Sequence, residues 1–119
     1  MTSKDKPRQL NSLRYDMLIL TTGDDGKPDG AGELTFSVDG LALPRVGDRL
    51  YFTEDDGLTV VVTEVEHWFN PDAPDVTRHR SITVVAHPDP SSREMTQKLL
   101  DPAELERWLI EYPWLSEYP

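Results

Sequence analysis

The feature that most constrains the fold of this chain is a series of five short apolar or alternating segments separated by turn-forming residues. In residues 33–39, for example, Leu34, Phe36 and Val38 alternate with polar side chains. A period of two is typical of a half-buried β-strand. The whole series predicts about five β-strands, which span residues 13–22, 33–39, 49–53, 58–69 and 77–87.

Two of the connections between the predicted strands consist of residues that favour turns. Residues 23–32 contain four glycines, one proline and three aspartates, so we expect an exposed, acidic tip that joins the first two strands in a hairpin. Residues 54–57 end in Asp-Gly, which predicts a tight turn between the third and fourth strands. Both stretches superficially resemble calcium loops, but their ligand spacing does not fit, so we interpret them as solvated turns.

Side-chain matching predicts how the last two strands pair. Placing Val62 opposite Ile82 brings apolar side chains together. The same register sets Glu66 opposite Arg78 and lets Trp68 lean on Arg78. Because this end of the hairpin is half polar, we expect it to project beyond the core.

The last third of the chain is helical in character. Capping patterns at residues 91–94 and 101–104 predict the starts of helices, and Pro113 predicts the end of the second one. The second helix carries one apolar stripe at helical spacing, which suits a helix that caps the sheet and is formed by Leu105, Trp108, Leu109 and Tyr112.

These elements predict an α+β fold. We expect a small bent antiparallel sheet, or an open SH3-like or OB-like β-barrel, of about five strands with one or two C-terminal helices. Residues 1–12 have no apolar periodicity and are interpreted as a mobile N-terminal arm. Residues 13–119 are expected to form a single domain, with the sheet or barrel in 13–90, the helical part in 91–112 and an aromatic tail in 113–119.

The charge of the chain limits its partners. It has 22 acidic residues against 12 Lys and Arg residues, a net charge of −10 at pH 7. Such a charge repels nucleic-acid phosphates and anionic membranes. No apolar run approaches the ~20 residues that span a bilayer, and the first residues lack the apolar stretch of a signal peptide. We therefore expect a cytoplasmic protein of bacterial type, with no nucleic-acid and no membrane partner.

Cofactor chemistry also finds little support. The chain has no cysteine, which excludes disulfides, thiolate metal sites and cysteine nucleophiles. Its glycines do not follow the spacing of a phosphate-binding loop, so no nucleotide is expected. In the register above, His67 and His79 are diagonal neighbours with backbones roughly 7 to 8 Å apart. They are weak metal candidates that would need a third ligand such as Asp72 or Asp75, and we expect no cofactor and no catalytic residue.

A basic and aromatic patch on the same hairpin could stack a nucleic-acid base. Acidic residues oppose it, so we interpret it as ion-paired strand surface. It comprises His67, Trp68, Phe69, Arg78, His79 and Arg80.

The aromatic C-terminus is the most informative feature for function. Large aromatic side chains dominate the energetics of protein interfaces. The leading hypothesis is a small non-catalytic protein-interaction module that uses a sheet edge or this tail, with self-association as one form. One alternative is an acidic inhibitor or immunity-type protein that binds a basic partner, and another is a small enzyme or metal-binding protein using His67 and His79. The expected partner-binding residues are Trp114, Leu115, Tyr118, Trp68 and Arg78.

Overall fold

The computed structural model describes residues 13–53 and 57–118. The predicted arm at residues 1–12 and the predicted turn residues 54–56 lie outside this range. The strands are β1 (Leu13–Thr22), β2 (Pro28–Gly40), β3 (Arg49–Phe52), β4 (Leu58–Phe69), β5 (Arg80–Pro88) and β6 (Leu115–Glu117). The helices are the 3-10 turns η1 (Val76–Arg78) and η2 (Pro90–Ser92) and the α-helices α1 (Arg93–Lys98) and α2 (Pro102–Ile110).

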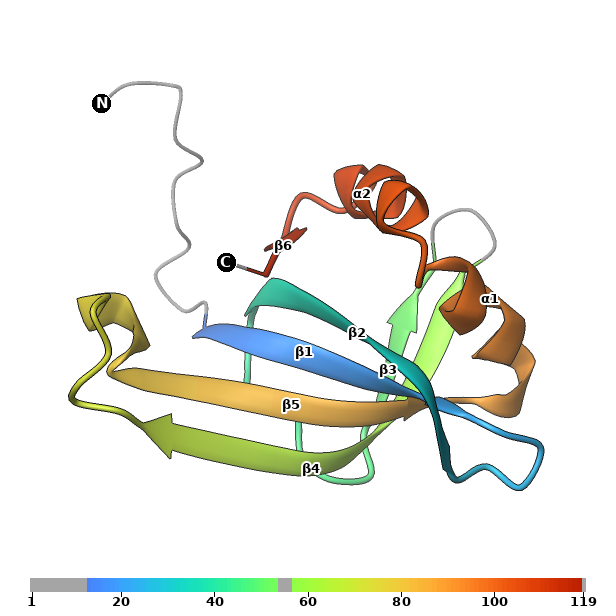
Figure 1. Cartoon of the computed structure of the whole chain (residues 1–119), viewed down its shortest axis with the longest axis horizontal. Coiled ribbons are helices and arrows are strands. Elements are labelled where there is room, and N and C mark those ends of the chain that lie inside the picture. The colour runs from blue at the N-terminus through green and yellow to red at the C-terminus, as the bar shows by residue number, and fades with distance from the viewer. Residues whose placement is uncertain (1–12, 54–56, 119) are drawn as a thin grey trace.

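All six strands belong to one curled sheet in the order β3-β4-β5-β1-β2-β6 (Figure 1). Neighbouring strands are antiparallel except β1 and β5, which are parallel. The predicted α+β fold with a barrel-like sheet and two C-terminal helices is therefore confirmed. The sheet also has one parallel pair and a sixth strand in the tail, which the residue pattern does not predict.

The core fills the inside of this half-barrel. It is lined by alternate residues of β1, β2, β4 and β5, as the period of two predicts. Helix α2 covers the open side, where Trp108 contacts Phe36 of β2 and Phe52 of β3 with ring centroids 5.6 and 5.5 Å apart. Tyr112 joins this cluster at 4.8 Å from Trp108. Edge-on aromatic pairs of this kind contribute about 0.5–1.5 kcal/mol each beyond their burial.

The predicted register of the last hairpin is wrong. Val62 lies opposite Ala86 and not opposite Ile82. Because apolar residues recur at every second position of β5, side-chain matching cannot distinguish registers that differ by an even number of residues. Glu66 consequently faces Thr83.

A β-bulge adds to this error. Thr63 is the extra residue between two consecutive pairs of the ladder, and its hydroxyl donates to the carbonyl oxygen of Val85 at 3.3 Å. The bulge moves the core-facing positions of β4 from even to odd numbers, so that Val65 packs against the core. A strictly alternating interpretation of residues 58–69 misses this shift.

The far end of the β4–β5 hairpin projects as expected (Figure 1). The burial of β4 falls from its first residues to an exposed stretch at His67, Trp68 and Phe69. Residues 76–78 form η1 rather than the start of the fifth strand, which begins at Arg80. Arg78 therefore lies outside the β4–β5 ladder, and its side chain reaches Asp16 of β1.

The two helices begin close to the predicted positions. The Asp101 carboxylate accepts a hydrogen bond from the Ala103 amide and caps α2 as expected. At α1 the cap residue is Ser92, whose hydroxyl instead accepts from the Thr59 amide of β4 at 2.9 Å. Among residues 13–53 and 57–118, none of the helices has the length and the apolar character of a membrane span.

Candidate functional site

The aromatic tail forms the outermost strand beside β2. Leu115 packs against the core, whereas Trp114 and Tyr118 keep 57% and 47% of their surface exposed. Ser116 lies opposite Ser37 of β2. Alternation along a strand therefore puts Leu115 on the core face and Ser116 on the opposite face, which we call the outer face. Two large aromatic side chains thus flank a short edge strand.

Polar contacts fasten this strand from the outer face. Arg78 donates from Nη2 to Asp16 Oδ2 at 2.9 Å and to Tyr118 Oη at 3.2 Å. Its guanidinium lies 5.4 Å from the centroid of the Tyr118 ring. Arg14 of β1 donates to the hydroxyl of Ser116 at 3.0 Å. The tail is therefore ordered against β1 before it meets any partner.

Asp16 is the buried centre of these contacts. It is only 5% exposed although it lies on the outer face of β1. Its second carboxylate oxygen accepts from the Ser37 hydroxyl at 3.1 Å. The hydrogen bond to Asp16 raises the pKa of the Arg78 guanidinium. A buried carboxylate held in this way needs its cation, so Arg78 is a structural as well as a surface residue.

The backbone of the tail leaves one side open. The Asp39 amide donates to the Trp114 carbonyl oxygen at 2.9 Å, which shows that Trp114 and Ser116 direct their backbone groups toward β2. Leu115 and Glu117 then direct theirs away from the sheet. The Leu115 amide bonds the Tyr112 carbonyl oxygen, and no described strand pairs with the other groups on this side.

Trp68 does not join this surface. It lies opposite Ser81 near the end of β4 and is 54% exposed. Strands β5, β1 and β2 separate it from β6. The structure brings two of the five predicted partner-binding residues, Arg78 and Tyr118, into contact. Trp114 and Leu115 lie next to Tyr118 in the chain, at the start of β6, whereas Trp68 lies at the other edge of the sheet.

The predicted proximity of the two histidines is wrong. His67 lies opposite Ile82 in the ladder, whereas His79 precedes β5 and its Nε2 lies 2.9 Å from the carbonyl oxygen of Ala73. The corrected register removes their diagonal relationship. Among the described residues, no group of three His, Cys, Asp or Glu side chains is placed to hold a metal ion.

The acidic tip is organised by its own carboxylates. Asp29 accepts from the Thr21 hydroxyl at 2.7 Å and from the Ala31 amide at 2.9 Å. The Thr21 bond is the main reason that the pKa of Asp29 lies below its ordinary value. Asp25 accepts from the Lys27 amide. These are the contacts of Asx turns.

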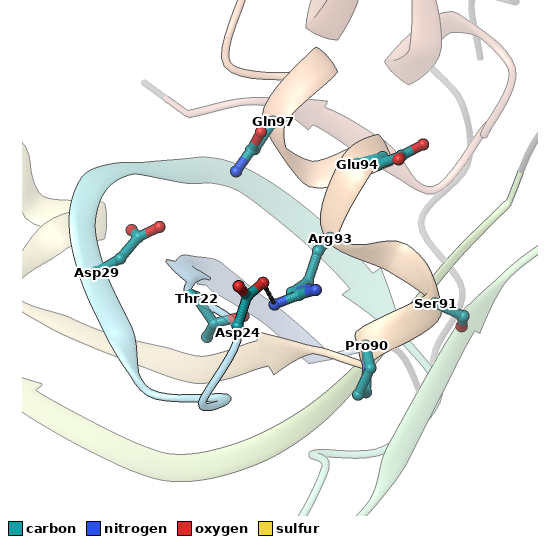
Figure 2. A pocket seen from close by; sticks show the side chains of 9 residues that line it. Thr22, Asp24, Asp29, Pro90, Ser91, Arg93, Glu94 and Gln97 are labelled. Carbon is teal, nitrogen blue, oxygen red and sulfur yellow. Dashed lines mark hydrogen bonds and ion pairs between the residues drawn. The ribbon is translucent and has the colours of Figure 1, made fainter.

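A polar hollow of about 520 Å³ lies between this tip and α1 (Figure 2). Arg93 of α1 reaches across it to the Asp24 carboxylate at 2.9 Å. Thr22 lies close to this ion pair, and its buried hydroxyl has no hydrogen-bond partner among the described residues. Because the lining residues come from segments far apart in the sequence, no local motif indicates this hollow. Its charged lining consists of the carboxylates of Asp24, Asp29 and Glu94 and the single cation Arg93. No described residues there form a catalytic pair.

No family model, no curated protein and no solved structure matches this chain.

Proposed function

We propose that this protein is a non-catalytic protein-interaction module of the bacterial cytoplasm that self-associates through the open side of β6. The observation that carries this proposal is the placement of Trp114 and Tyr118 on either side of Ser116 in an edge strand with unpaired backbone groups. Such an edge is a template for pairing with another chain.

The open side of β6 is self-complementary. In an antiparallel pair of two copies centred on Ser116, Leu115 of each chain faces Glu117 of the other, and these are the residues whose backbone groups point outward. The same register sets Trp114 of each copy opposite Tyr118 of the other, so this aromatic pair occurs twice. Cross-strand aromatic pairs contribute about 0.5–1.5 kcal/mol each. The Leu115 amide keeps its bond to the Tyr112 carbonyl oxygen, so the bond between copies runs from the Glu117 amide of each chain to the Leu115 carbonyl oxygen of the other. One two-fold axis therefore makes this backbone bond twice and pairs the aromatic side chains.

Two further properties bear on the strength of this contact. Arg78 holds Tyr118 and Arg14 holds Ser116 in place in the isolated chain, which reduces the entropy lost on association. Self-association is opposed by electrostatic repulsion, because each copy carries a net charge of −10. Salt screens this repulsion, so we expect self-association to strengthen as salt is added. A complex of the acidic protein with a basic partner would show the opposite dependence.

The proposal is tested by light scattering after size exclusion across a concentration series, at about 0.05 M and about 0.5 M salt. We expect a dimer that becomes more populated at the higher salt. Glu117→Pro removes an amide that points away from β2, so it should weaken the dimer while leaving the internal ladder intact. Trp114→Ser should weaken it as well.

Ile110→Ser is the matched control because Ile110 is a large apolar residue that is 76% exposed on α2 and lies outside β6. It should leave the dimer unchanged. A protein that stays monomeric at every concentration and salt, or a dimer that survives both Glu117→Pro and Trp114→Ser, would overturn the proposal. The alternative of an enzyme or metal protein that uses His67 and His79 has less support, because His67 lies opposite Ile82 in the ladder and His79 lies before β5.

A further inference from the structure

The other edge of the sheet is open along half of β4. Strand β3 pairs with β4 only from Leu58 to Val61. Val62 still bonds the backbone of Gly47 and Asp48. Gly47 then adopts a φ of +94°, which favours glycine, and the chain turns away from β4. No described segment pairs with the rest of this edge.

The backbone groups along this open half can be assigned. The Asn70 amide donates to the His79 carbonyl oxygen at 2.7 Å, so Asn70 points toward β5. In an antiparallel ladder the hydrogen-bonding direction alternates. Val65, His67 and Phe69 therefore direct their amide and carbonyl groups to the open side. His67 and Phe69 are exposed and Val65 is partly exposed, so an added strand has three residues with which to pair.

The side chains beside these groups are acidic. Glu64 and Glu66 share the outer face of β4 with Trp68, because Glu64 lies opposite Val85 and Glu66 opposite Thr83. Neither carboxylate forms an ion pair with any described residue. No Lys or Arg occurs from residue 63 to residue 69. The open half of β4 therefore presents two unneutralised carboxylates, two residues apart, along a row of free backbone groups.

We propose that this edge binds an extended basic segment of another protein by strand addition. Two cationic side chains, two residues apart in the bound segment, would lie opposite Glu64 and Glu66. A third position would lie over Trp68, where a cation or an apolar group is accommodated equally well. This contact lies on the opposite edge from the proposed dimer contact, so it adds a second partner class to that proposal.

A second copy of this chain is a poor occupant of the same edge. Pairing β4 with itself would place Glu64 and Glu66 of both chains on one face of the ribbon with no cation between them. Like charges on the same face of paired strands are destabilising. The absence of basic residues in this stretch thus acts against self-pairing and favours a basic partner.

The test titrates full-length protein with the peptide Thr-Lys-Val-Lys-Val-Lys-Thr and follows backbone amide signals by NMR. The control peptide Thr-Lys-Lys-Val-Val-Lys-Thr has the same composition, but no two of its lysines are two residues apart. We expect the alternating peptide to bind more tightly and to shift the amide signals of Val65, His67 and Phe69. Raising the salt should weaken its binding.

The double variant Glu64→Gln/Glu66→Gln should weaken this binding by about two- to thirty-fold, the range expected for two exposed ion pairs. The matched control Glu106→Gln/Glu111→Gln makes the same change of charge at exposed positions of the α2 region and should leave it unchanged.

Equal binding of the two peptides, or equal effects of the two double variants, would overturn the proposal. Glu117→Pro separates it from the self-association proposed above, since that variant should weaken the dimer and leave peptide binding intact. Shifts confined to residues of β6 would also count against strand addition at β4.

Discussion

The two open edges of the sheet offer the same backbone chemistry with opposite side chains. At β6 the outward groups belong to Leu115 and Glu117 and are flanked by exposed aromatic rings. Along the second half of β4 the outward groups lie beside Glu64 and Glu66. The first edge is tied to the sheet by long polar side chains, whereas the second is supported by β5 alone.

Such a difference would let one small sheet bind two kinds of partner. Unpaired amide and carbonyl groups give any edge strand an affinity for another strand, and the side chains decide which strand is accepted. Aromatic residues placed symmetrically about Ser116 favour a second copy of the chain. Carboxylates without nearby cations disfavour a second copy and favour a basic segment. Variants that weaken the contacts of one edge, with stability, association or hydrogen exchange as the measurement, test whether the two edges differ in this way.

The largest expected effect comes from Tyr15, which lies in the core on β1, opposite Val38 of β2, the strand that pairs with β6. It is 6% exposed, and burial raises the pKa of its phenol from 10.0 to about 12. Because the folded pKa is raised, the full stability is present below pH 10 and is lost as the pH rises toward 12. The loss should reach about 2 to 3 kcal/mol of unfolding free energy.

Urea denaturation at a series of alkaline pH values measures this loss. Tyr15→Phe should abolish it, since the variant has no phenol to ionise at this position. Tyr51, which is 63% exposed on β3, provides the control, and Tyr51→Phe should retain the alkaline loss. An unchanged alkaline loss in Tyr15→Phe would show that another group is responsible.

A somewhat smaller effect is expected at the ion pair that fastens β6. Arg78→Ala leaves the buried Asp16 carboxylate without its cation and should lower the unfolding free energy by about 1 to 3 kcal/mol. It also removes the contact to Tyr118, so the dimer should weaken. Denaturant unfolding and light scattering measure the two effects.

Arg93→Ala is the matched control because it breaks an ion pair of the same length, 2.9 Å, with the fully exposed Asp24. It should cost less than about 1 kcal/mol. Equal losses in the two variants would contradict the role assigned to burial. Asp16→Asn combined with Arg78→Ala should recover part of the loss, since the buried charge is then gone.

The sequence predicts much of the framework around these edges. The bounds expected for the first and fourth strands, residues 13–22 and 58–69, are those of β1 and β4. Here alternation or continuous apolar character extends over ten or more residues, so the signal is long. The apolar stripe that ends at Tyr112 likewise identifies α2 and its packing face. Long periodic patterns are thus sufficient for the body of the fold.

Neither edge can be assigned in the same way. Strand β6 has only three residues, which is too short for a period to be recognised. The Arg78–Asp16 pair joins residues 62 positions apart, and only the parallel placement of β5 beside β1 brings them together. Along β4 the register differs by four residues from the expected one before the bulge at Thr63 adds a fifth, so Glu66 lies opposite Thr83 and not opposite Arg78. Each failure concerns a contact fixed by tertiary geometry.

The smallest expected effect is an alternation in amide hydrogen exchange along β4. The amides of Val65, His67 and Phe69 point to the open side, so they should exchange rapidly in the free protein. Those of Glu66 and Trp68 point toward β5 and should be protected. Adding the alternating basic peptide should slow the first set and leave the second unchanged. NMR-detected exchange resolves the individual residues.

The first residues of β4 sharpen this prediction within the same strand. Thr59 and Val60 lie between β3 and β5, so their amides should be protected regardless of direction. Protection that is uniform through Phe69 in the free protein would mean that the edge is already covered in solution. Strand addition by a basic partner would then have to displace whatever covers it, and peptide binding would no longer change the exchange of Val65, His67 and Phe69.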